Sequence, residues 1–559
     1  MKYDNVFSLI EEITIKNQNR TALGHVTPLG WSELSYKGLG LLSRQLACYL
    51  LNDMKLEKGE RAAILSESKP EFGACVFGNA LAGLINVPLD IKLTIYEMTH
   101  ILNDSKPSVI LSSAANLEKA KELLKTITSL KRIIVIDKWE TIEEENIISL
   151  YSLPKNYSAT WVRRPLNSTA FIIYTSGTTG APKGVEITFK NMLSQMYGLK
   201  DVLDMILPPK ENLNILSILP MNHLFELTVG FFSYLNRGYS IYYPKSLKPK
   251  DIVDVMYEKQ IDFLTTVPAF LKLLKSYIES EVAKQPQSVQ QQFANRYKMA
   301  EFVPMNVRRY MFRDIHAKFG GKFYGCISGG APLDESVGIF FNRIGIEVFQ
   351  GYGLSETSPV VSIDRERPLD IKSVGKALDT LEVKTDKETG ELLVKGPSVM
   401  KGYYNRPDLT AEVITEDGWL HTGDIARIDE KTKKIYITGR IKNMIVLSGG
   451  KKVFPEEVEA VLEQNPNFSE VCVMGMKKNF GEKDGSEGIA AIIVPTQNYK
   501  ENYQTEEELL KAVTQEVKKL SLQLASYKRP VKIIVNKEPL PRTSTNKVSR
   551  KDIKQMINV

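Results

Sequence analysis

Short apolar runs alternate with longer stretches of helical periodicity over the first 440 residues. Six short apolar runs are typical of buried strands, and most of them end in Ser, Asp or Gly; they occupy residues 61–68, 108–113, 132–137, 170–177, 214–219 and 239–243. Residues 42–54 and 115–127 have the apolar spacing of amphipathic helices. Strands that alternate with helices predict parallel sheets covered by helices.

The pattern changes after residues 439–450, GRIKNMIVLSGG. Helical patterns at 454–464 and 505–524 then enclose apolar runs at 469–476 and 489–495. We therefore predict an α/β fold, with a large N-terminal domain of layered α/β subdomains (1–440), a hinge (441–443) and a small, mobile C-terminal α+β domain (444–559). The polar, Gln-rich residues 279–301 predict a helical insertion at the surface.

The composition is that of a folded protein. Of the 559 residues, 43% are hydrophobic and 25% charged, which excludes a disordered or collagen-like chain. The four cysteines lie far apart with no C-x-x-C, so neither a disulfide scaffold nor a zinc site is expected. The most apolar stretch, residues 224–235, contains Glu226 and is shorter than the roughly 20 residues of a membrane span. We expect a cytoplasmic protein, and contact with the inner face of a membrane stays open.

The net charge of +7 is concentrated near the C-terminus. Residues 505–559 contain 12 Lys and Arg against 6 Asp and Glu. This excess favours an anionic partner that meets the C-terminal segment, although a solvated helix surface would explain it equally well. No basic stripe interleaved with aromatic residues is visible, so a nucleic-acid partner is not expected.

The loop YTSGTTGAPKGV, residues 174–185, is the clearest chemical motif. Its glycines, Gly177, Gly180 and Gly184, permit close backbone approach, and its hydroxyls and amides can surround phosphate oxygens. Lys183 adds a positive charge. The loop is not a Walker A motif, because Pro182 stands where the second glycine is needed. Without further motifs, a flexible surface loop would be a competing interpretation.

Further motifs follow in a fixed order: ISGGAPLD (327–334), QGYGLSET (350–357), WLHTGD (419–424), GRIKNMIVLSGGKKVFPEEVE (439–459) and PRTSTNKVSR (541–550). Together with the loop, they resemble the adenylate-forming (AMP-binding) superfamily, which includes acyl-CoA synthetases, adenylation domains and luciferases. The resemblance covers nearly the whole chain and is strongest to long-chain fatty acyl-CoA synthetases.

The resemblance implies an ATP site with Mg²⁺. Glu356 and Thr178 would hold the metal, while the Asp424 carboxylate would accept the ribose hydroxyls with help from Arg440. Taken singly, Asp424 and the GYG turn would be ordinary turn residues. The implied nucleotide-binding residues are Thr175, Ser176, Gly177, Thr178, Thr179, Gly180, Lys183, Gly329, Gly330, Ala331, Pro332, Gln350, Gly351, Tyr352, Gly353, Ser355, Asp424 and Arg440.

The resemblance also implies two catalytic residues. Lys547 would place a cation between a carboxylate and the α-phosphate, and His223 would form a wall between nucleotide and acid. His223 between apolar runs is equally typical of a core histidine, and His421 is expected to be structural. Lys442 falls at the hinge, and Gly449 and Gly450 would flank a pantetheine channel.

The chain departs from the commoner family pattern at four positions. Ser355 replaces Thr and keeps the hydroxyl, whereas Asn546 replaces the Gly before Lys547 and tolerates a left-handed backbone. Asn443 occupies a position where the family usually has Asp, and Val446 one where it usually has Lys.

The expected activity has two steps. A fatty acid would react with ATP to give acyl-adenylate and pyrophosphate, and coenzyme A would then take the acyl group and release AMP. The alternative acceptor is acyl carrier protein. A non-catalytic nucleotide-binding scaffold is a third possibility, against which the retained Lys183, Glu356 and Lys547 argue. Residues 224–235 and 267–274 could line an acyl tunnel or belong to the core.

Overall fold

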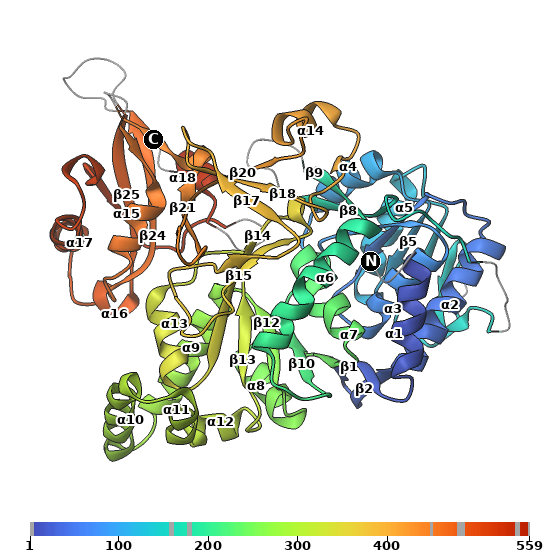
Figure 1. The fold of residues 1–559 in the computed structure, drawn as a ribbon, viewed down its shortest axis with the longest axis horizontal. Helices are drawn as coiled ribbons and strands as arrows, with labels where there is room; N and C mark the ends of the chain where they lie inside the picture. The colour runs from blue at the N-terminus through green and yellow to red at the C-terminus, as the bar shows by residue number, and fades with distance from the viewer. Residues whose placement is uncertain are drawn as a thin grey trace. The chain divides into compact units, whose positions relative to one another are not determined.

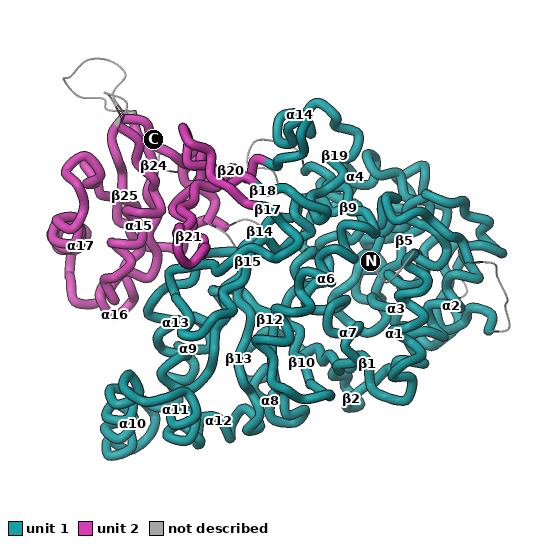
Figure 2. The backbone as a smooth tube through the Cα atoms, in the orientation of Figure 1, with its two compact units in different colours: residues 1–177, 181–382, 394–420 teal, residues 178–180, 383–393, 421–559 magenta. Residues whose placement is uncertain are grey.

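The protein forms two compact units (Figure 2). The first contains residues 1–177, 181–382 and 394–420, and the second contains residues 178–180, 383–393 and 421–559. The computed structural model describes residues 5–142, 144–155, 161–175, 182–447, 451–477, 487–542 and 548–556. The predicted domain boundaries and hinge stay predictions, because compactness alone does not test where the chain bends.

The first sheet of the larger unit has eight strands and is parallel over its central part (Figure 1). Its strands in spatial order are β19 (Gly402–Tyr403), β9 (Lys183–Thr188), β8 (Thr169–Thr175), β4 (Ile85–Pro88), β3 (Arg61–Leu65), β5 (Val109–Ser112), β6 (Arg132–Val135) and β7 (Ile147–Ser149). β9 and β19 run antiparallel to their neighbours. The loop between β8 and β9 therefore starts and ends at the same edge of the sheet.

The second sheet of this unit has nine strands, parallel from β14 through β1. Its strands in spatial order are β16 (Lys376–Ala377), β15 (Val360–Ile363), β14 (Glu347–Gly353), β13 (Gly325–Ser328), β12 (Phe263–Thr266), β10 (Asn214–Ser217), β11 (Ser240–Tyr243), β1 (Thr21–Thr27) and β2 (Gly30–Ser35).

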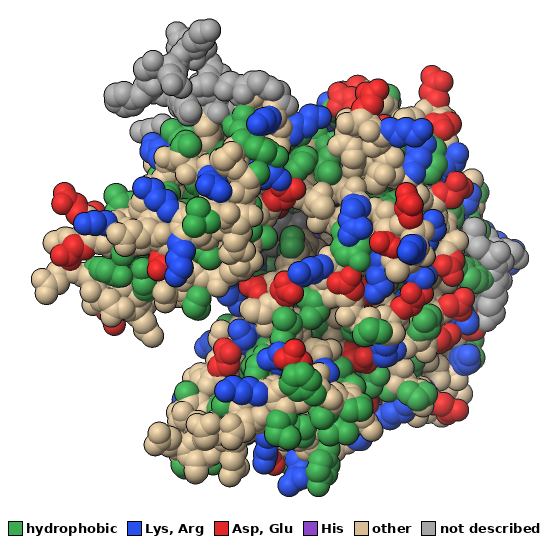
Figure 3. All heavy atoms as spheres, turned by 60° about the vertical axis from the view of Figure 1, so that its left-hand side comes forward, with side chains coloured by type: hydrophobic (Ala, Val, Ile, Leu, Met, Phe, Trp, Pro, Cys, Tyr) green, Lys and Arg blue, Asp and Glu red, His purple; other side chains and the backbone are tan. Residues whose placement is uncertain are grey.

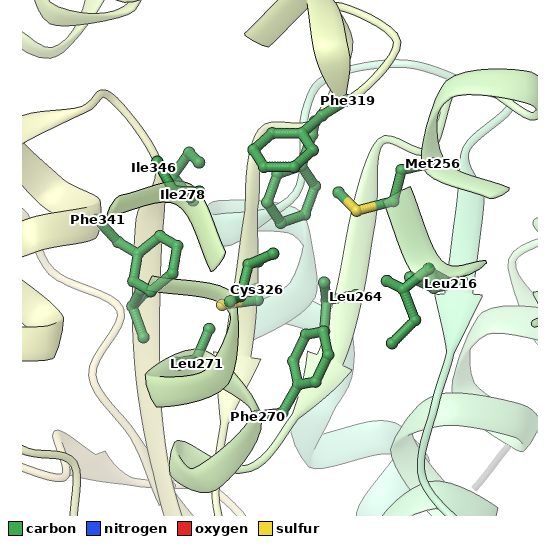
Figure 4. Close-up of a cluster of buried hydrophobic side chains, with 14 of the residues drawn as sticks. Leu216, Met256, Leu264, Phe270, Leu271, Ile278, Phe319, Cys326, Phe341 and Ile346 are labelled. Carbon is green, nitrogen blue, oxygen red and sulfur yellow. The ribbon is translucent and has the colours of Figure 1, made fainter. Parts of the chain in front are cut away.

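Helices pack around both sheets of the larger unit and close its cores. In Figure 4, Leu264 of β12 and Cys326 of β13 meet Leu271 and Phe341 from the helices, so one face of the second sheet is sealed by apolar packing. The helices of this unit are α1 (Val6–Lys16), α2 (Tyr36–Asn52), α3 (Pro70–Leu81), α4 (Ile95–Ser105), α5 (Leu117–Thr126), α6 (Phe189–Ile206), α7 (Tyr234–Asn236), α8 (Pro249–Glu258), α9 (Pro268–Ala283), α10 (Gln287–Met299), α11 (Met305–Met311), α12 (Arg313–Lys318), α13 (Glu335–Arg343) and α14 (Pro407–Val413).

Five short 3-10 or π segments complete the larger unit. They are η1 (Ala114–Asn116), η2 (Leu150–Ser152), the π-helix η3 (Glu226–Ser233), η4 (Ala300–Phe302) and η5 (Ser355–Thr357).

Three sheets and four helices make up most of the smaller unit. The sheets are β17 (Glu382–Thr385), β18 (Glu391–Lys395), β20 (Leu420–Ile428) and β21 (Ile435–Arg440); β22 (Ile445–Val446) and β23 (Lys452–Val453); and β24 (Phe468–Lys477), β25 (Glu487–Pro495) and β26 (Lys532–Val535). The helical segments are η6 (Ile441–Asn443), α15 (Pro455–Leu462), α16 (Gln497–Lys500), α17 (Glu506–Ser521), η7 (Ser526–Lys528) and α18 (Arg550–Met556).

The sequence of α17 explains where that helix begins and how it packs. The Thr505 hydroxyl accepts from the backbone N–H of Glu508, whose carboxylate accepts from the N–H of Thr505, a reciprocal capping box. Three glutamates in the first turn and two lysines in the last complement the helix dipole. Val513 and Val517 are buried against the β24–β25 sheet.

The predicted fold class is confirmed. Each of the six predicted strands overlaps a strand of a parallel sheet, because runs buried on both faces need apolar residues throughout. The Gln-rich insertion spans the end of α9 and all of α10, and α10 has no buried residue. Among the residues described, no helix combines the length and apolar character needed to cross a bilayer.

Candidate active site

The base of the predicted phosphate loop is fixed by strand pairing. Thr175, the last residue of β8, lies directly opposite Lys183, the first residue of β9. Five predicted loop residues lie outside the described residues: Ser176, Gly177, Thr178, Thr179 and Gly180. The predicted role of Thr178 in metal binding therefore stays a prediction. Gly184 belongs to β9, where an added Cβ would come within 2.7 Å of Ile172 Cγ2. This glycine is required by sheet packing, which differs from the role expected for it.

The carboxyl ends of β13 and β14 bring together the two predicted adenine-binding segments. The strands are parallel neighbours, so Gly329 follows β13 at the same edge where β14 ends. A Cβ on Gly329 would lie 3.1 Å from the Phe225 ring and 3.4 Å from the Gly351 carbonyl oxygen. Gly329 is buried, whereas Gly330, Ala331 and Pro332 are exposed and accessible to a ligand. Carboxyl ends of parallel strands are where such sheets bind ligands.

Two residues of the QGYGLSET segment, Gln350 and Gly353, stabilise the conformation of the chain around it. The Gln350 amide donates to the backbone carbonyls of Ile371 and Ser373, and this side chain is buried. A Cβ on Gly353 would lie 1.8 Å from the Pro359 carbonyl oxygen, so only glycine fits there. These contacts shape the turn, while Gly351, Tyr352 and Ser355 are partly exposed along it.

Tyr403 connects two of the predicted site residues. Its hydroxyl donates to Glu356 Oε1 over 2.8 Å, and the Nζ of Lys183 lies 5.2 Å from the centre of its ring. Burial, followed by the negative charge of Glu356, raises the pKa of Tyr403, which keeps the phenol protonated as a donor. Backbone bonds from Met400 to Glu356 and from Tyr404 to Gly184 hold the same segment in place.

The donor chemistry of Glu356 suits Mg²⁺. A single carboxylate is typical of magnesium sites completed by phosphates and water. Within the described part of the chain, no group of three or more His, Cys, Asp or Glu residues could form a protein-only metal site. When bound, the metal would supply positive charge to the phosphates.

His223 precedes the π-helix η3. Its carbonyl accepts from the N–H of Leu227, and its side chain is partly buried. Three residues further on, Glu226 is fully buried and accepts from the Ser217 hydroxyl at 2.5 Å. Burial raises the pKa of Glu226 to about 8, so the carboxyl is protonated at neutral pH. Residues 224–235 are packed into the core, with Phe231 5.5 Å from Phe77 between ring centres.

The second candidate region lies in the smaller unit, on the hairpin of β20 and β21. Asp424 and Arg440 are cross-strand partners, and Arg440 Nε donates to Asp424 Oδ1 over 2.6 Å. Asp424 is 2% exposed, whereas the Arg440 side chain is 45% exposed. Glu391 holds the preceding turn: Oε1 accepts from the Gly423 N–H at 2.7 Å and Oε2 lies 2.8 Å from His421 Nδ1. His421 therefore has the structural contact expected of it.

The predicted hinge residue Lys442 lies within η6 and is exposed. Beside it, the Asn443 amide donates to Glu456 Oε1 at 2.6 Å. An aspartate at position 443 would place its carboxylate next to that of Glu456, and the two negative charges would repel each other. This repulsion explains why the chain has asparagine where the commoner family pattern has aspartate.

Three further predicted residues, Gly449, Gly450 and Lys547, lie outside the described residues. The segments on either side of residues 543–547 are well anchored. Arg542 pairs with Glu470 at 2.8 Å, and Arg550 Nη2 donates to both carboxylate oxygens of Glu459, at 2.5 and 2.7 Å. Hydrogen bonds between two charged groups are stronger than those between neutral groups, so this contact helps to anchor the start of α18.

Comparison with known protein families shows to which family the chain belongs. The AMP-binding enzyme family matches residues 11–404, and the AMP-binding enzyme C-terminal domain matches residues 457–547. The chain belongs to the AMP-binding enzyme family. The resemblance to the adenylate-forming superfamily is thereby confirmed.

Curated relatives match over almost the whole length of this AMP-binding enzyme. A long-chain-fatty-acid–CoA ligase of Escherichia coli O6:H1 is 28% identical, covering 99% of this chain and 94% of the relative. A luciferin 4-monooxygenase of Luciola mingrelica is 27% identical, covering 92% of this chain and 88% of the relative.

Solved structures show the same fold. ATP-bound MatB from Rhodopseudomonas palustris has a TM-score of 0.76 at 23% identity, covering 98% of both chains. The anthranilate CoA ligase AuaEII with anthranoyl-AMP has a TM-score of 0.78 at 19% identity, covering 99% of this chain and 97% of the other.

The sequence does not predict the contacts of three residues of this AMP-binding enzyme: Tyr403, Glu391 and Glu226. Tyr403 and Glu391 lie far along the chain from the residues they contact, so no local spacing marks them. The sequence does carry a signal for Glu226, since it is the one charged residue within the apolar run 224–235, but the run alone does not predict which residue Glu226 contacts.

Proposed function

We propose that this AMP-binding enzyme activates a fatty acid with ATP and transfers the acyl group to coenzyme A. The observation that carries the proposal is the similarity to long-chain-fatty-acid–CoA ligases, which extends over 99% of the chain. The geometry of Glu356, Tyr403 and Lys183 supports a phosphate site, and the Asp424–Arg440 pair supports a ribose site.

In the first step, a carboxylate oxygen forms a bond to the α-phosphorus while the bond to the β-phosphate oxygen breaks. Pyrophosphate leaves with that electron pair, and the acyl-adenylate is a mixed anhydride. Lys183 would attract the phosphates, and Lys547 would stabilise the charge that develops between carboxylate and α-phosphate. His223 would separate the acid from the nucleotide.

In the second step, the thiol of coenzyme A attacks the acyl carbon, the C–O bond to AMP breaks, and the thiol proton passes to solvent. Gly449 and Gly450 would leave room for the pantetheine arm, and Lys442 would be the pivot of the domain movement between steps. A fatty substrate is favoured energetically by about 0.8 kcal/mol for each buried CH₂ group.

The test is AMP release with fatty acids of graded length, with coenzyme A and acyl carrier protein supplied in parallel. We expect AMP and a thioester only with coenzyme A and long acids. Thioester formed only on the carrier protein would establish the alternative acceptor, and no AMP with any fatty acid would refute the substrate class.

Lys547→Ala tests the first step. We expect pyrophosphate release to fall by about a thousandfold or more while ATP binding persists. Lys554→Ala is the matched control, because Lys554 is an exposed lysine of the same segment on α18. Equal pyrophosphate release by Lys547→Ala and the control would refute the role of Lys547.

A further inference from the structure

One surface of the larger unit combines exposed apolar side chains with positive charge. It is built from α10, η4, α11 and α12, and we call it the α10–α12 surface. Phe302 is 84% exposed, Tyr310 68% and Met299 60%. Val307 lies one helical turn before Tyr310 on the same face of α11 and is also exposed. In Figure 3, hydrophobic side chains gather with Lys and Arg at the lower end of the molecule, where Figure 1 places these helices.

The elements under this surface are tied to one another. Arg296 of α10 donates to the Met311 carbonyl at 3.2 Å, and Arg308 of α11 donates to the Val303 carbonyl at 2.8 Å. The Arg313 guanidinium of α12 lies 5.0 Å from the ring centre of Tyr310. The apolar side chains are therefore presented by a braced set of helices.

The exposed charge of the surface is positive. Residues 287–322 contain seven Arg and Lys but two acidic residues, Glu301 and Asp314. Each acidic side chain is neutralised locally, Glu301 by Arg343 at 2.5 Å and Asp314 by Arg296 at 3.6 Å. Among the described residues, no carboxylate lies within ion-pair distance of the exposed Lys298, Arg313 or Lys322. Charges of this kind attract an anionic surface.

We propose that the α10–α12 surface docks on an anionic phospholipid bilayer. Aromatic and Met side chains enter the headgroup boundary of a bilayer, while Lys and Arg extend to the phosphates. A second copy of the chain is disfavoured as the occupant, because an isologous contact would bring like charges together. The proposal does not depend on the proposed function, although docking would bring the enzyme to where long-chain acids partition.

The experiment is co-sedimentation of the full-length protein with vesicles of phosphatidylcholine alone or with added phosphatidylglycerol. We expect binding to the anionic vesicles that weakens as salt is raised. Phe302→Ser/Tyr310→Ser and Lys298→Gln/Arg313→Gln should each weaken this binding about tenfold or more. Tyr96→Ser matches Phe302 in exposure at 84%, and Lys58→Gln/Lys125→Gln removes exposed charges elsewhere; both should bind as wild type.

Three results would overturn the proposal. The first is no binding of the wild-type protein to anionic vesicles, and the second is equal loss of binding in the surface and control variants. The third is a change from dimer to monomer in the surface variants without a change in vesicle binding, which would make a second copy the occupant. Circular dichroism of every variant shows whether a loss of vesicle binding comes from misfolding. AMP release by every variant shows whether catalysis is affected as well.

Discussion

The hydroxyl of Tyr403 donates to Glu356 Oε1 over 2.8 Å, although the two residues are 47 positions apart in the chain. One carboxylate oxygen of Glu356 is thereby held by a neutral donor. The same tyrosine ring lies 5.2 Å from Lys183 Nζ, so one side chain orients both the predicted metal ligand and the predicted phosphate-binding cation.

Tyr403→Phe should weaken the Mg²⁺-dependent part of ATP binding about tenfold, because a hydrogen bond to a charged group is lost while the ring under Lys183 is kept. Isothermal titration with ATP, in Mg²⁺ and in EDTA, measures this part directly. Tyr404→Phe is the control, since it removes a neighbouring phenol. If the ratio of the ATP affinity in Mg²⁺ to that in EDTA is the same in Tyr403→Phe as in wild type, Tyr403 does not position Glu356.

Asp424→Asn should remove the preference for a ribose with free hydroxyls, because the carboxylate is the acceptor proposed for both of them. We expect wild type to bind ATP about tenfold or more tightly than 2′,3′-dideoxy-ATP, and the variant to bind them nearly alike. Competition binding with both nucleotides checks this. If the preference survives in the variant, the ribose is bound elsewhere.

Gly353→Ala should destabilise the larger unit by about 2 kcal/mol or more, because its Cβ would overlap the Pro359 carbonyl oxygen at 1.8 Å. Gly351→Ala is the matched control two residues earlier, where the nearest atom would lie at an ordinary 3.5 Å. Thermal unfolding of both variants measures the difference. Equal melting temperatures would contradict the close approach at Gly353.

Glu226→Gln should stabilise the protein increasingly as pH rises. The unfolded carboxyl ionises near 4.5, whereas burial raises the pKa of the folded group to about 8. Between these values the folded state holds a proton that the unfolded state has lost, so wild-type stability falls with rising pH. Glutamine keeps the shape and can still accept from Ser217.

Unfolding by denaturant at several pH values tests this prediction. The free energies of unfolding of wild type and Glu226→Gln should differ by a constant below about pH 4.5 and diverge by up to on the order of 4 kcal/mol by pH 8. A difference independent of pH would show that Glu226 is ionised in the folded protein at neutral pH.

Much of the fold could be predicted because each buried strand carries its own signal. Residues 132–137 are apolar on both faces and become β6 within a parallel sheet. The sequence predicts candidate site residues where they are close together in the chain, as in the segments around Thr175 and Glu356. Contacts between residues far apart in the chain could not be predicted, as with Tyr403 at Glu356 or Glu391 at His421.

By itself, the sequence determined the alternation of strands and helices, the α/β class and the motifs of an AMP-binding enzyme, because periodicity and short loops are local properties. Only the tertiary structure decided which residues from elsewhere in the chain contact those motifs. Gly184 and Gly353 are glycines because another chain segment presses against them, and Asn443 is an amide because Glu456 faces it. Such contacts depend on how distant segments pack, which spacing along the chain does not encode.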